Sequence, residues 1–367
     1  MRQKLRLVAM GATSIALAVA LAACGEAGGG DDNGNEGEGN GESGGSIGLL
    51  LPDDVTTRYE TFDRPYIEAK IQELCADCEV QYSNAGNDTN AQKQQFDALL
   101  TQGVDVIILD AVDSAATADW VADAEAEGVP VIAYDRLAEG NVEAYISYDN
   151  ERVGELQGQT LVDSLGGVTD PRVVMINGAP TDPNAGMFKS GAHSVLDGAA
   201  DIVFEQDVEE WDGGIANEEM TAAIDSLGAD GFDGVYVAND GMAAGVITAL
   251  NSAGITGLPV GGQDAELAGL QRIVSGEQTF TIYKALRPQA ETTAEVAVAL
   301  LRGEDFADLT PDSVDSPTNE GIPSTLLDPV AVTADNIADT VIADEFYTVE
   351  QICTADYAQA CQEAGLS

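Results

Sequence analysis

From Ser46 onward the chain alternates between short apolar runs and longer amphipathic segments. The runs are six to nine residues long and are rich in Val, Ile and Leu, as is typical of buried strands. They span residues 46–51, 79–85, 104–112 and 129–136. The segments between them have helical spacing, near 64–76, 89–102 and 114–127. Gly103-Val104 and Gly128-Val129 mark points where a helix would end and a strand begin. This alternation predicts an α/β fold with a parallel sheet.

A second series of apolar runs follows the first. Its members are residues 172–179, 201–208, 234–240, 258–264 and 279–284. Two doubly wound lobes of ordinary domain size fit the 367 residues of the chain.

Polar and aromatic residues stand where the predicted strands end. In open parallel sheets, ligands bind outside the carboxyl ends of the strands. The first series places residues 52–59 and Asp135-Arg136 there, and the second places Asn184, Trp211-Asp212, Asn239-Asp240, Gln263-Asp264 and Lys284. Acids, amides, bases and aromatic residues therefore gather at one edge in both lobes.

This set of side chains suits a sugar. Hydroxyl groups need hydrogen-bond donors and acceptors together, which Asp, Asn, Arg and Lys supply. An arginine held by a neighbouring carboxylate can still fork two bonds to adjacent hydroxyls, and the rings of Tyr59 and Trp211 offer flat apolar surfaces. The alternative for Asp135 and Arg136 is an ion pair that only closes the sheet edge. No cysteine or histidine joins the set, and the single histidine, His193, lies on a predicted helix, so we expect neither a metal nor a cofactor.

The N-terminus has the organisation of a targeting segment. A basic start is followed by an apolar stretch over residues 7–20 and by Leu21-Ala22-Ala23-Cys24. The last four residues resemble a bacterial lipobox, which implies lipidation of Cys24 and an extracytoplasmic protein anchored to the cell membrane. Residues 1–23 would be the signal peptide and 24–45, rich in Gly and acids, a tether. A plain signal peptide followed by a chance cysteine is the alternative.

Four further cysteines remain, an even number for an oxidising compartment. Cys75 and Cys78 form a CxxC near a predicted helix end, and Cys353 and Cys361 lie close together near the C-terminus. We predict two local disulfides. A redox site would place CxxC at a helix start, and a zinc site would have to draw on two pairs far apart in sequence.

The formal net charge of −49 restricts the kinds of molecule that the protein can bind. A negative field of this size repels phosphate backbones, so we expect no nucleic-acid partner. It would also suit a salty habitat, where screening reduces the repulsion; this hypothesis predicts lower stability at low salt.

The chain from about 47 to 350 resembles the periplasmic sugar-binding proteins of the xylose and multi-sugar type. The resemblance is carried by PDDVTTRYE, VIAYDR, ISYDNERVGELQ, ANDGMAAG, GQDAELAGLQRIVSGEQTFTIYK and IPSTLLDPVAVT. It implies two lobes joined by a three-stranded hinge that close on a monosaccharide and present it to an ABC permease. The resemblance also implies nine ligand contacts, although Tyr59 stands where the family has tryptophan. They are Arg58, Tyr59, Asp135, Arg136, Asn184, Trp211, Asp240, Asp264 and Lys284.

The resemblance also implies lobe boundaries and a function. The first lobe would comprise 46–148 and about 286–316, and the second 149–285 and about 317–367. We expect a monomeric binding protein, with xylose as the first candidate ligand. The alternatives are a multi-sugar binding protein that serves a chemoreceptor or sensor kinase and, more distantly, a surface glycoside hydrolase, because carboxylates are frequent among the predicted contacts.

Overall fold

The computed structural model describes residues 44–366. The predicted signal peptide, Cys24 and the tether up to residue 43 lie outside the described residues. Within the described part, no helix is both long and apolar enough to cross a membrane.

The first lobe is built on a seven-stranded sheet in the order β10-β11-β5-β4-β3-β1-β2. Neighbouring strands are parallel except for β10, which is antiparallel to β11. The strands are β1 (Ser46–Leu51), β2 (Glu79–Asn84), β3 (Val106–Leu109), β4 (Val131–Tyr134), β5 (Ala144–Tyr148), β10 (Asp312–Val314) and β11 (Ile322–Leu327). The four strands predicted first along the chain all form, with ends shifted by at most three residues.

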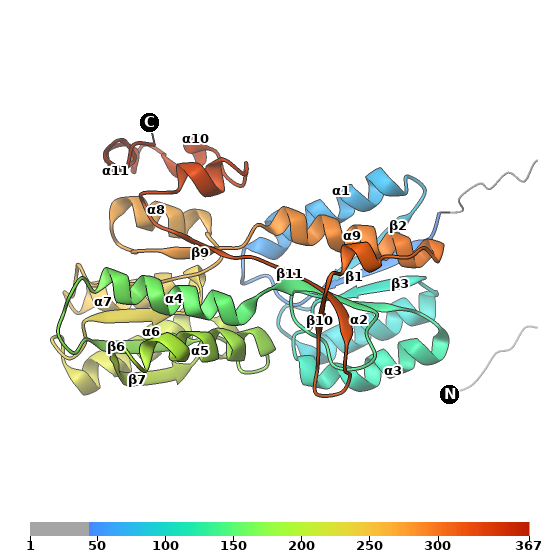
Figure 1. Cartoon of the computed structure of the whole chain (residues 1–367), viewed down its shortest axis with the longest axis horizontal. Helices are drawn as coiled ribbons and strands as arrows, with labels where there is room; N and C mark the ends of the chain where they lie inside the picture. The colour runs from blue at the N-terminus through green and yellow to red at the C-terminus, as the bar shows by residue number, and fades with distance from the viewer. Residues whose placement is uncertain (1–43, 367) are drawn as a thin grey trace, which may run out of the picture. The chain divides into compact units, whose positions relative to one another are not determined.

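Helices cover both faces of this sheet (Figure 1). On one face lie α1 (Arg64–Leu74) and α9 (Leu286–Arg302), and on the other lie α2 (Thr89–Gln102) and α3 (Ala118–Glu127). Strand β1 shows why both faces need cover: Leu49 packs in the core shared with α1 and α9, whereas Leu50 packs in the core shared with α2 and α3. The doubly wound architecture thus follows from strands that are apolar on both sides.

The second lobe contains a three-stranded parallel sheet in the order β7-β6-β8. Its elements are α4 (Asn150–Ser164), β6 (Arg172–Asn177), α5 (Pro183–Leu196), β7 (Asp201–Asp207), α6 (Gly213–Leu227), β8 (Gly234–Val237), α7 (Asp240–Ser252), α8 (Leu267–Ser275) and β9 (Thr281–Tyr283), followed after the last crossing by β12 (Val330–Val332), α10 (Val349–Ile352) and α11 (Ala358–Glu363). The run 258–264, predicted as a strand, makes only isolated bridges through Val260 and Gln263. Strand β9 pairs antiparallel with β12.

The chain crosses between the lobes three times: between β5 and α4, between β9 and α9, and between β11 and β12. The predicted boundary near residue 316 needs correction at the third crossing. Strand β11 pairs in parallel with β5, from Ser324 opposite Tyr145 to Leu327 opposite Tyr148. Its backbone groups are therefore satisfied by the first sheet, and the first lobe extends to Leu327.

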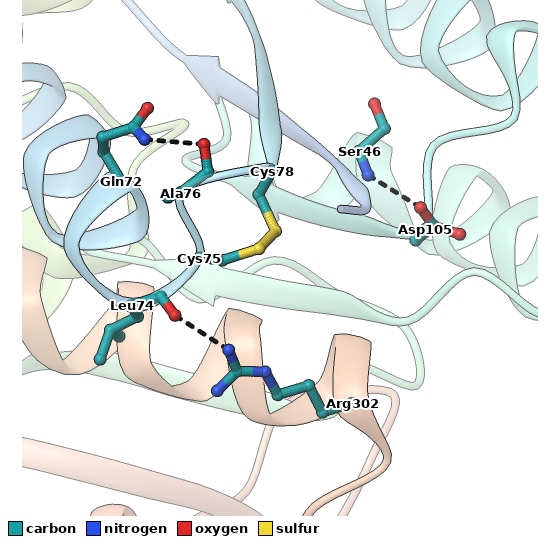
Figure 2. Close-up of a disulfide and its surroundings, with 8 residues drawn as sticks. All are labelled: Ser46, Gln72, Leu74, Cys75, Ala76, Cys78, Asp105 and Arg302. Carbon is teal, nitrogen blue, oxygen red and sulfur yellow. Dashed lines mark hydrogen bonds between the residues drawn. A yellow bond between two sulfur atoms is a disulfide. The ribbon is translucent and has the colours of Figure 1, made fainter. Parts of the chain in front are cut away.

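Two disulfides, Cys75–Cys78 and Cys353–Cys361, are present in the structure. The first closes the turn between α1 and β2, as Figure 2 shows. Beside it, the Arg302 guanidinium at the end of α9 donates to the carbonyl of Leu74 at the end of α1, at 2.9 Å. This disulfide therefore secures a helix end that α9 also holds.

Close packing of α4 on α5 depends on glycine. A Cβ on Gly191 of α5 would lie 2.0 Å from the backbone oxygen of Glu151, whereas a Cβ on Gly186 of the same helix would meet nothing within 4 Å. Because α5 also carries Asn184 and Phe188, this contact sets the position of two cavity residues described below.

We expect Gly191→Ala to lower the unfolding free energy by about 1–3 kcal/mol, because the helices must separate to admit the methyl group. Gly186→Ala should raise it by about 0.5–1 kcal/mol, because alanine favours the helix and meets no obstacle. Urea unfolding of both variants measures the two effects. Equal shifts in the same direction would contradict this account of the helix contact.

Candidate functional site

A cavity lies between the two lobes, with about 290 Å³ of empty space that is partly open to solvent. The first lobe lines it with residues from the loop after β1 and from the end of β4. The second lobe contributes residues that follow β6, β7, β8 and β9 and the 258–264 run. The lining residues are Thr56, Arg58, Tyr59, Asp135, Arg136, Asp182, Asn184, Phe188, Trp211, Asn239, Gln263, Asp264 and Lys284. Eight of the nine predicted contacts are therefore brought together, and Asp240 is the exception.

Arg58 organises the first-lobe side of the cavity. Its guanidinium donates to both carboxylate oxygens of Asp63, at 2.9 and 2.8 Å, and to Oδ1 of Asp135, at 2.8 Å. It also donates to Oε1 of Gln289 on α9, at 2.8 Å. Arg58 precedes the π-helical turn Tyr59–Asp63, which brings Asp63 back to its guanidinium.

Asp135 presents one carboxylate oxygen to the cavity. Its φ of 57° turns the chain sharply at the end of β4, and its backbone oxygen accepts from Ser147 Oγ at 2.7 Å and Asn184 Nδ2 at 3.0 Å. Oδ1 accepts from Arg58 and Gln289, but among the described residues no hydrogen bond reaches Oδ2. Burial opposes ionisation, yet Arg58 and the other neighbouring cations lower the pKa of Asp135 to about 2. A ligand hydroxyl would therefore meet a charged acceptor.

Arg136 joins the two lobes. Its Nε lies 2.9 Å from Oδ2 of Asp182 in the second lobe, and its other nitrogens donate to Ala111 O at 3.0 Å and Asp53 Oδ2 at 3.3 Å. It also donates to the Tyr59 hydroxyl at 3.3 Å. The expected ion pair between Asp135 and Arg136 is not formed, because Asp135 pairs with Arg58 and Arg136 pairs with Asp53, Asp110 and Asp182. Arg136 lines the cavity, and its contact with a ligand stays a prediction.

Aromatic side chains form the second-lobe wall. Trp211 is 5% exposed and meets Phe188 edge to face, with ring centroids 6.4 Å apart. Its six-membered ring lies so close to Gly178 that a Cβ there would be 2.1 Å from it. Glycine is therefore required at position 178 for the indole to reach the cavity.

Lys284 and Asp264 complete the polar lining. The ammonium nitrogen of Lys284 lies 2.9 Å from Oδ1 of Asp264, which Gln263 Nε2 also approaches, at 3.4 Å. Asp264 has a φ of 86°, so its carboxylate leaves the backbone at a left-handed turn, as does that of Asp135. Lys284 retains N–H donors beyond this pair, because an ammonium group has three.

The prediction of Asp240 as a ligand contact needs correction. Asp240 is fully buried behind the cavity wall, where its carboxylate accepts from Gln278 Nε2 at 2.6 Å, Thr281 Oγ1 at 3.0 Å and the Glu266 N–H at 2.9 Å. Its predecessor Asn239, which caps α7, lines the cavity instead. Adjacent residues at a helix start point in different directions, and the sequence pattern did not distinguish them.

Five lining residues were not among the predicted contacts: Thr56, Asp182, Phe188, Asn239 and Gln263. Thr56, Asn239 and Gln263 stand at predicted strand ends, although the resemblance did not imply them as contacts. The other two also had a usable signal. Asp182 caps α5 two residues before Asn184, and Phe188 stands four residues after Asn184 on that helix, hence on the same face. The ion pair of Asp182 with Arg136 crosses the lobes and had no local signal.

Residues 44–366 contain no grouping of His, Cys, Asp and Glu suited to a metal ion. The carboxylates at the cavity instead pair with arginine or lysine. The arrangement can hold a compact polar molecule through fixed donors and acceptors, with aromatic surfaces on its apolar faces.

Two α/β lobes with a polar cavity between them are the architecture of a binding protein that holds a small ligand between its lobes. Residues 47–305 match the family described as a periplasmic binding protein domain. The chain belongs to this family.

The chain is also similar to proteins whose names state the sugar that they bind. The chain is 35% identical to the D-xylose-binding periplasmic protein of Escherichia coli (strain K12), over 83% of this chain and 92% of that protein. It is 31% identical to the multiple sugar-binding periplasmic receptor ChvE of Rhizobium radiobacter, over 84% and 92%. A solute-binding protein of an ABC transporter from Clostridium phytofermentans, solved with bound β-D-glucose, superimposes with a TM-score of 0.76 at 28% identity, over 84% of this chain and 99% of that one.

The buried Asp240 predicts a pH effect on stability. Burial and the nearby Glu266 raise the pKa of Asp240 to about 8, against the opposing charge of Arg272. In the unfolded chain the same carboxyl has a pKa of about 4. Between these values the folded state binds the extra proton, so this group's contribution to the unfolding free energy falls as pH rises.

We therefore expect the stability of the wild type relative to Asp240→Asn to be greater at pH 5 than at pH 8. Urea unfolding at both values measures the difference, with the exposed Asp225→Asn in α6 as the matched control. A difference that stays constant with pH would show that Asp240 is ionised throughout.

Proposed function

We propose that this protein is an extracytoplasmic solute-binding lipoprotein that captures a monosaccharide, xylose first, between its closing lobes and delivers it to an ABC permease. The observation that carries the proposal is the composition of the cavity. Charged donors and acceptors from both lobes face it beside Tyr59, Phe188 and Trp211. A ligand that contacts groups of both lobes favours the closed form, because the open form offers only part of these contacts.

The charge around the cavity favours a neutral ligand. The cavity is lined by three carboxyls, Asp135, Asp182 and Asp264, and by three basic groups, Arg58, Arg136 and Lys284. Three further carboxyls, those of Asp53, Asp63 and Asp110, pair with the two arginines from behind the lining. A sugar acid would add a negative charge to a site that is already rich in carboxyls, at a cost that its hydroxyl contacts would have to offset. A neutral pentose or hexose avoids this cost.

The relatives support xylose and a broader range of sugars as its alternative. The chain resembles D-xylose-binding periplasmic proteins of Escherichia coli and Haemophilus influenzae, at 35% and 34% identity. The multiple sugar-binding relatives favour the alternative, a receptor for several sugars that also serves a chemoreceptor or sensor kinase. The same cavity would serve uptake and sensing.

The glycoside hydrolase alternative receives less support. Glycosidases need one carboxyl to act as a general acid and another to act as a base or nucleophile. Here Asp135 pairs with Arg58, Asp264 with Lys284 and Asp182 with Arg136. Arg58 and the other nearby cations lower the pKa of Asp135 to about 2, which suits a hydrogen-bond acceptor rather than a general acid. Incubation with aryl glycosides separates the classes, because only an enzyme releases the aryl group.

Isothermal titration of residues 44–367 with xylose, glucose, galactose, arabinose and ribose tests the proposal. Affinity for xylose alone, with a dissociation constant of about 1 μM, would identify a dedicated xylose receptor. Similar affinities for xylose and glucose would identify a multi-sugar receptor. Absence of binding across the panel would contradict the proposed ligand class.

In the same titration, Asp135→Asn should weaken sugar binding by about 10- to 100-fold, because a charged acceptor is lost and Arg58 loses one of its two carboxylate partners. Asp54→Asn, an exposed acid in the same loop as Arg58 that does not line the cavity, is the matched control and should bind as the wild type does. Equal affinities for all three proteins would remove Asp135 from the site.

A further inference from the structure

Gln289 lies behind the cavity wall and joins two of the lining residues. It stands in the first turn of α9, is fully buried and does not itself line the cavity. Its Oε1 accepts from Nη2 of Arg58 at 2.8 Å. Its Nε2 donates to Oδ1 of Asp135 at 3.1 Å and to the carbonyl of Ile146 on β5 at 3.3 Å. One neutral side chain thus contacts both a base and an acid that line the ligand space.

The neighbours of Gln289 fix the orientation of its amide. The Arg58 guanidinium can only donate hydrogen bonds, whereas the ionised carboxylate of Asp135 and the carbonyl of Ile146 can only accept them. A reversed amide would turn its NH2 group toward a cation and its oxygen toward two acceptors, so all three contacts would be lost. The side chain therefore has a single favourable placement.

Gln289 completes the set of partners of Arg58. A guanidinium has five N–H donors. Four are used: Nε and one N–H of Nη2 donate to Asp63, one N–H of Nη1 donates to Asp135, and the other N–H of Nη2 donates to Gln289. Among the described residues the fifth donor has no acceptor, and it belongs to Nη1, the nitrogen that binds Asp135. A single N–H of Arg58 therefore remains for a ligand.

Gln289 also sets the angle of the Asp135 carboxylate. Oδ1 receives two donors, from Arg58 and Gln289, whereas no hydrogen bond from the described residues reaches Oδ2. Without Gln289, Arg58 alone would set the rotation about the last bond of the side chain, a torsion with a broad energy minimum. The second donor narrows this rotation and leaves Oδ2 free. The first lobe thus offers a ligand one donor and one acceptor on adjoining groups.

We propose that Gln289 is a positioning residue for ligand binding, which holds Arg58 and Asp135 so that the free N–H and the free oxygen bind sugar hydroxyls together. This inference rests on the proposed function, because it assigns a role within the same site. A hydroxyl group both donates and accepts, so it suits such a pair. Holding the pair in place before the ligand arrives raises affinity, because less freedom is lost on binding.

Isothermal titration of the protein with xylose and glucose tests the inference by a double-mutant cycle. Gln289→Met nearly keeps the size of the side chain but removes its donor and its acceptor. It should weaken the sugar that the wild type binds by about tenfold. In the Asp135→Asn background the same substitution should weaken binding by about threefold or less, because the charged acceptor that Gln289 positions is already lost.

Gln289→Glu gives an independent measurement with a pH profile. The introduced carboxyl would adjoin that of Asp135, and burial with a neighbouring negative charge raises its pKa above the usual value of about 4.3, while cations limit the rise. In the protonated form it can donate to Asp135 as the amide does, and in the ionised form it repels Asp135. The charged and titratable groups around this pair are Arg58, Asp63, Tyr134, Arg136, Tyr148 and Lys284.

We expect Gln289→Glu to bind within about threefold of the wild type at pH 5 and about tenfold or more weakly at pH 8, each compared with the wild type at the same pH. Gln72→Glu is the matched control, because it adds the same charge at an exposed position of α1, the helix that packs on α9. It should bind as the wild type does at both pH values.

Three results would each overturn the positioning role and leave the proposed function intact. They are equal affinities of the wild type and Gln289→Met, the same loss with and without the Asp135 carboxylate, and a Gln289→Glu effect that does not change between pH 5 and pH 8. Absence of binding by the wild type across the monosaccharide panel would instead remove the proposed function, and the positioning role with it.

Discussion

The pairing of buried charges at the strand ends is the constraint on which this structure depends. Arg58 and Arg136 are each 3% exposed, and removing a guanidinium from water costs several kcal/mol unless carboxylates compensate for it. Arg58 is compensated within its own lobe by Asp63 and Asp135, whereas Arg136 also needs Asp182 from the other lobe. The ion pairs therefore hold hydrogen-bond acceptors in place at the cavity. The Arg136–Asp182 pair also links the loop after β4 to the second lobe, so that it forms only when the lobes are close together.

Left-handed turns make this arrangement possible at three points. Asp135, Trp211 and Asp264 all have positive φ, and each lies where the chain leaves a strand or bridge toward the cavity. A residue with a side chain pays for this conformation. Here hydrogen bonds from neighbouring residues hold the backbone in this conformation. The Asp135 carbonyl, for example, accepts from Ser147, Tyr145 and Asn184. Local strain is thus maintained by contacts that are distant in sequence.

Sequence patterns predicted the parts of the fold that local physics controls. Apolar runs identified β1, β3 and β4 because strands buried on both faces must be apolar throughout. Gly103 and Gly128 marked the ends of α2 and α3 because each adopts the left-handed conformation. The pattern failed where pairing partners decide the outcome. The run 258–264 is apolar enough for a strand but makes only bridges, and β11 belongs to the first sheet because its partner is β5.

The same division applies to the site. The sequence by itself determined which strand ends carry polar and aromatic side chains, because the carboxyl ends of parallel strands converge at one edge, and eight of nine predicted residues reach one cavity. Only the tertiary structure decided which neighbour at a strand end faces the ligand space. Asn239 lines the cavity and Asp240 lies behind it, bound by Gln278 and Thr281. That choice depends on the direction of each side chain relative to the other lobe, which no local pattern encodes.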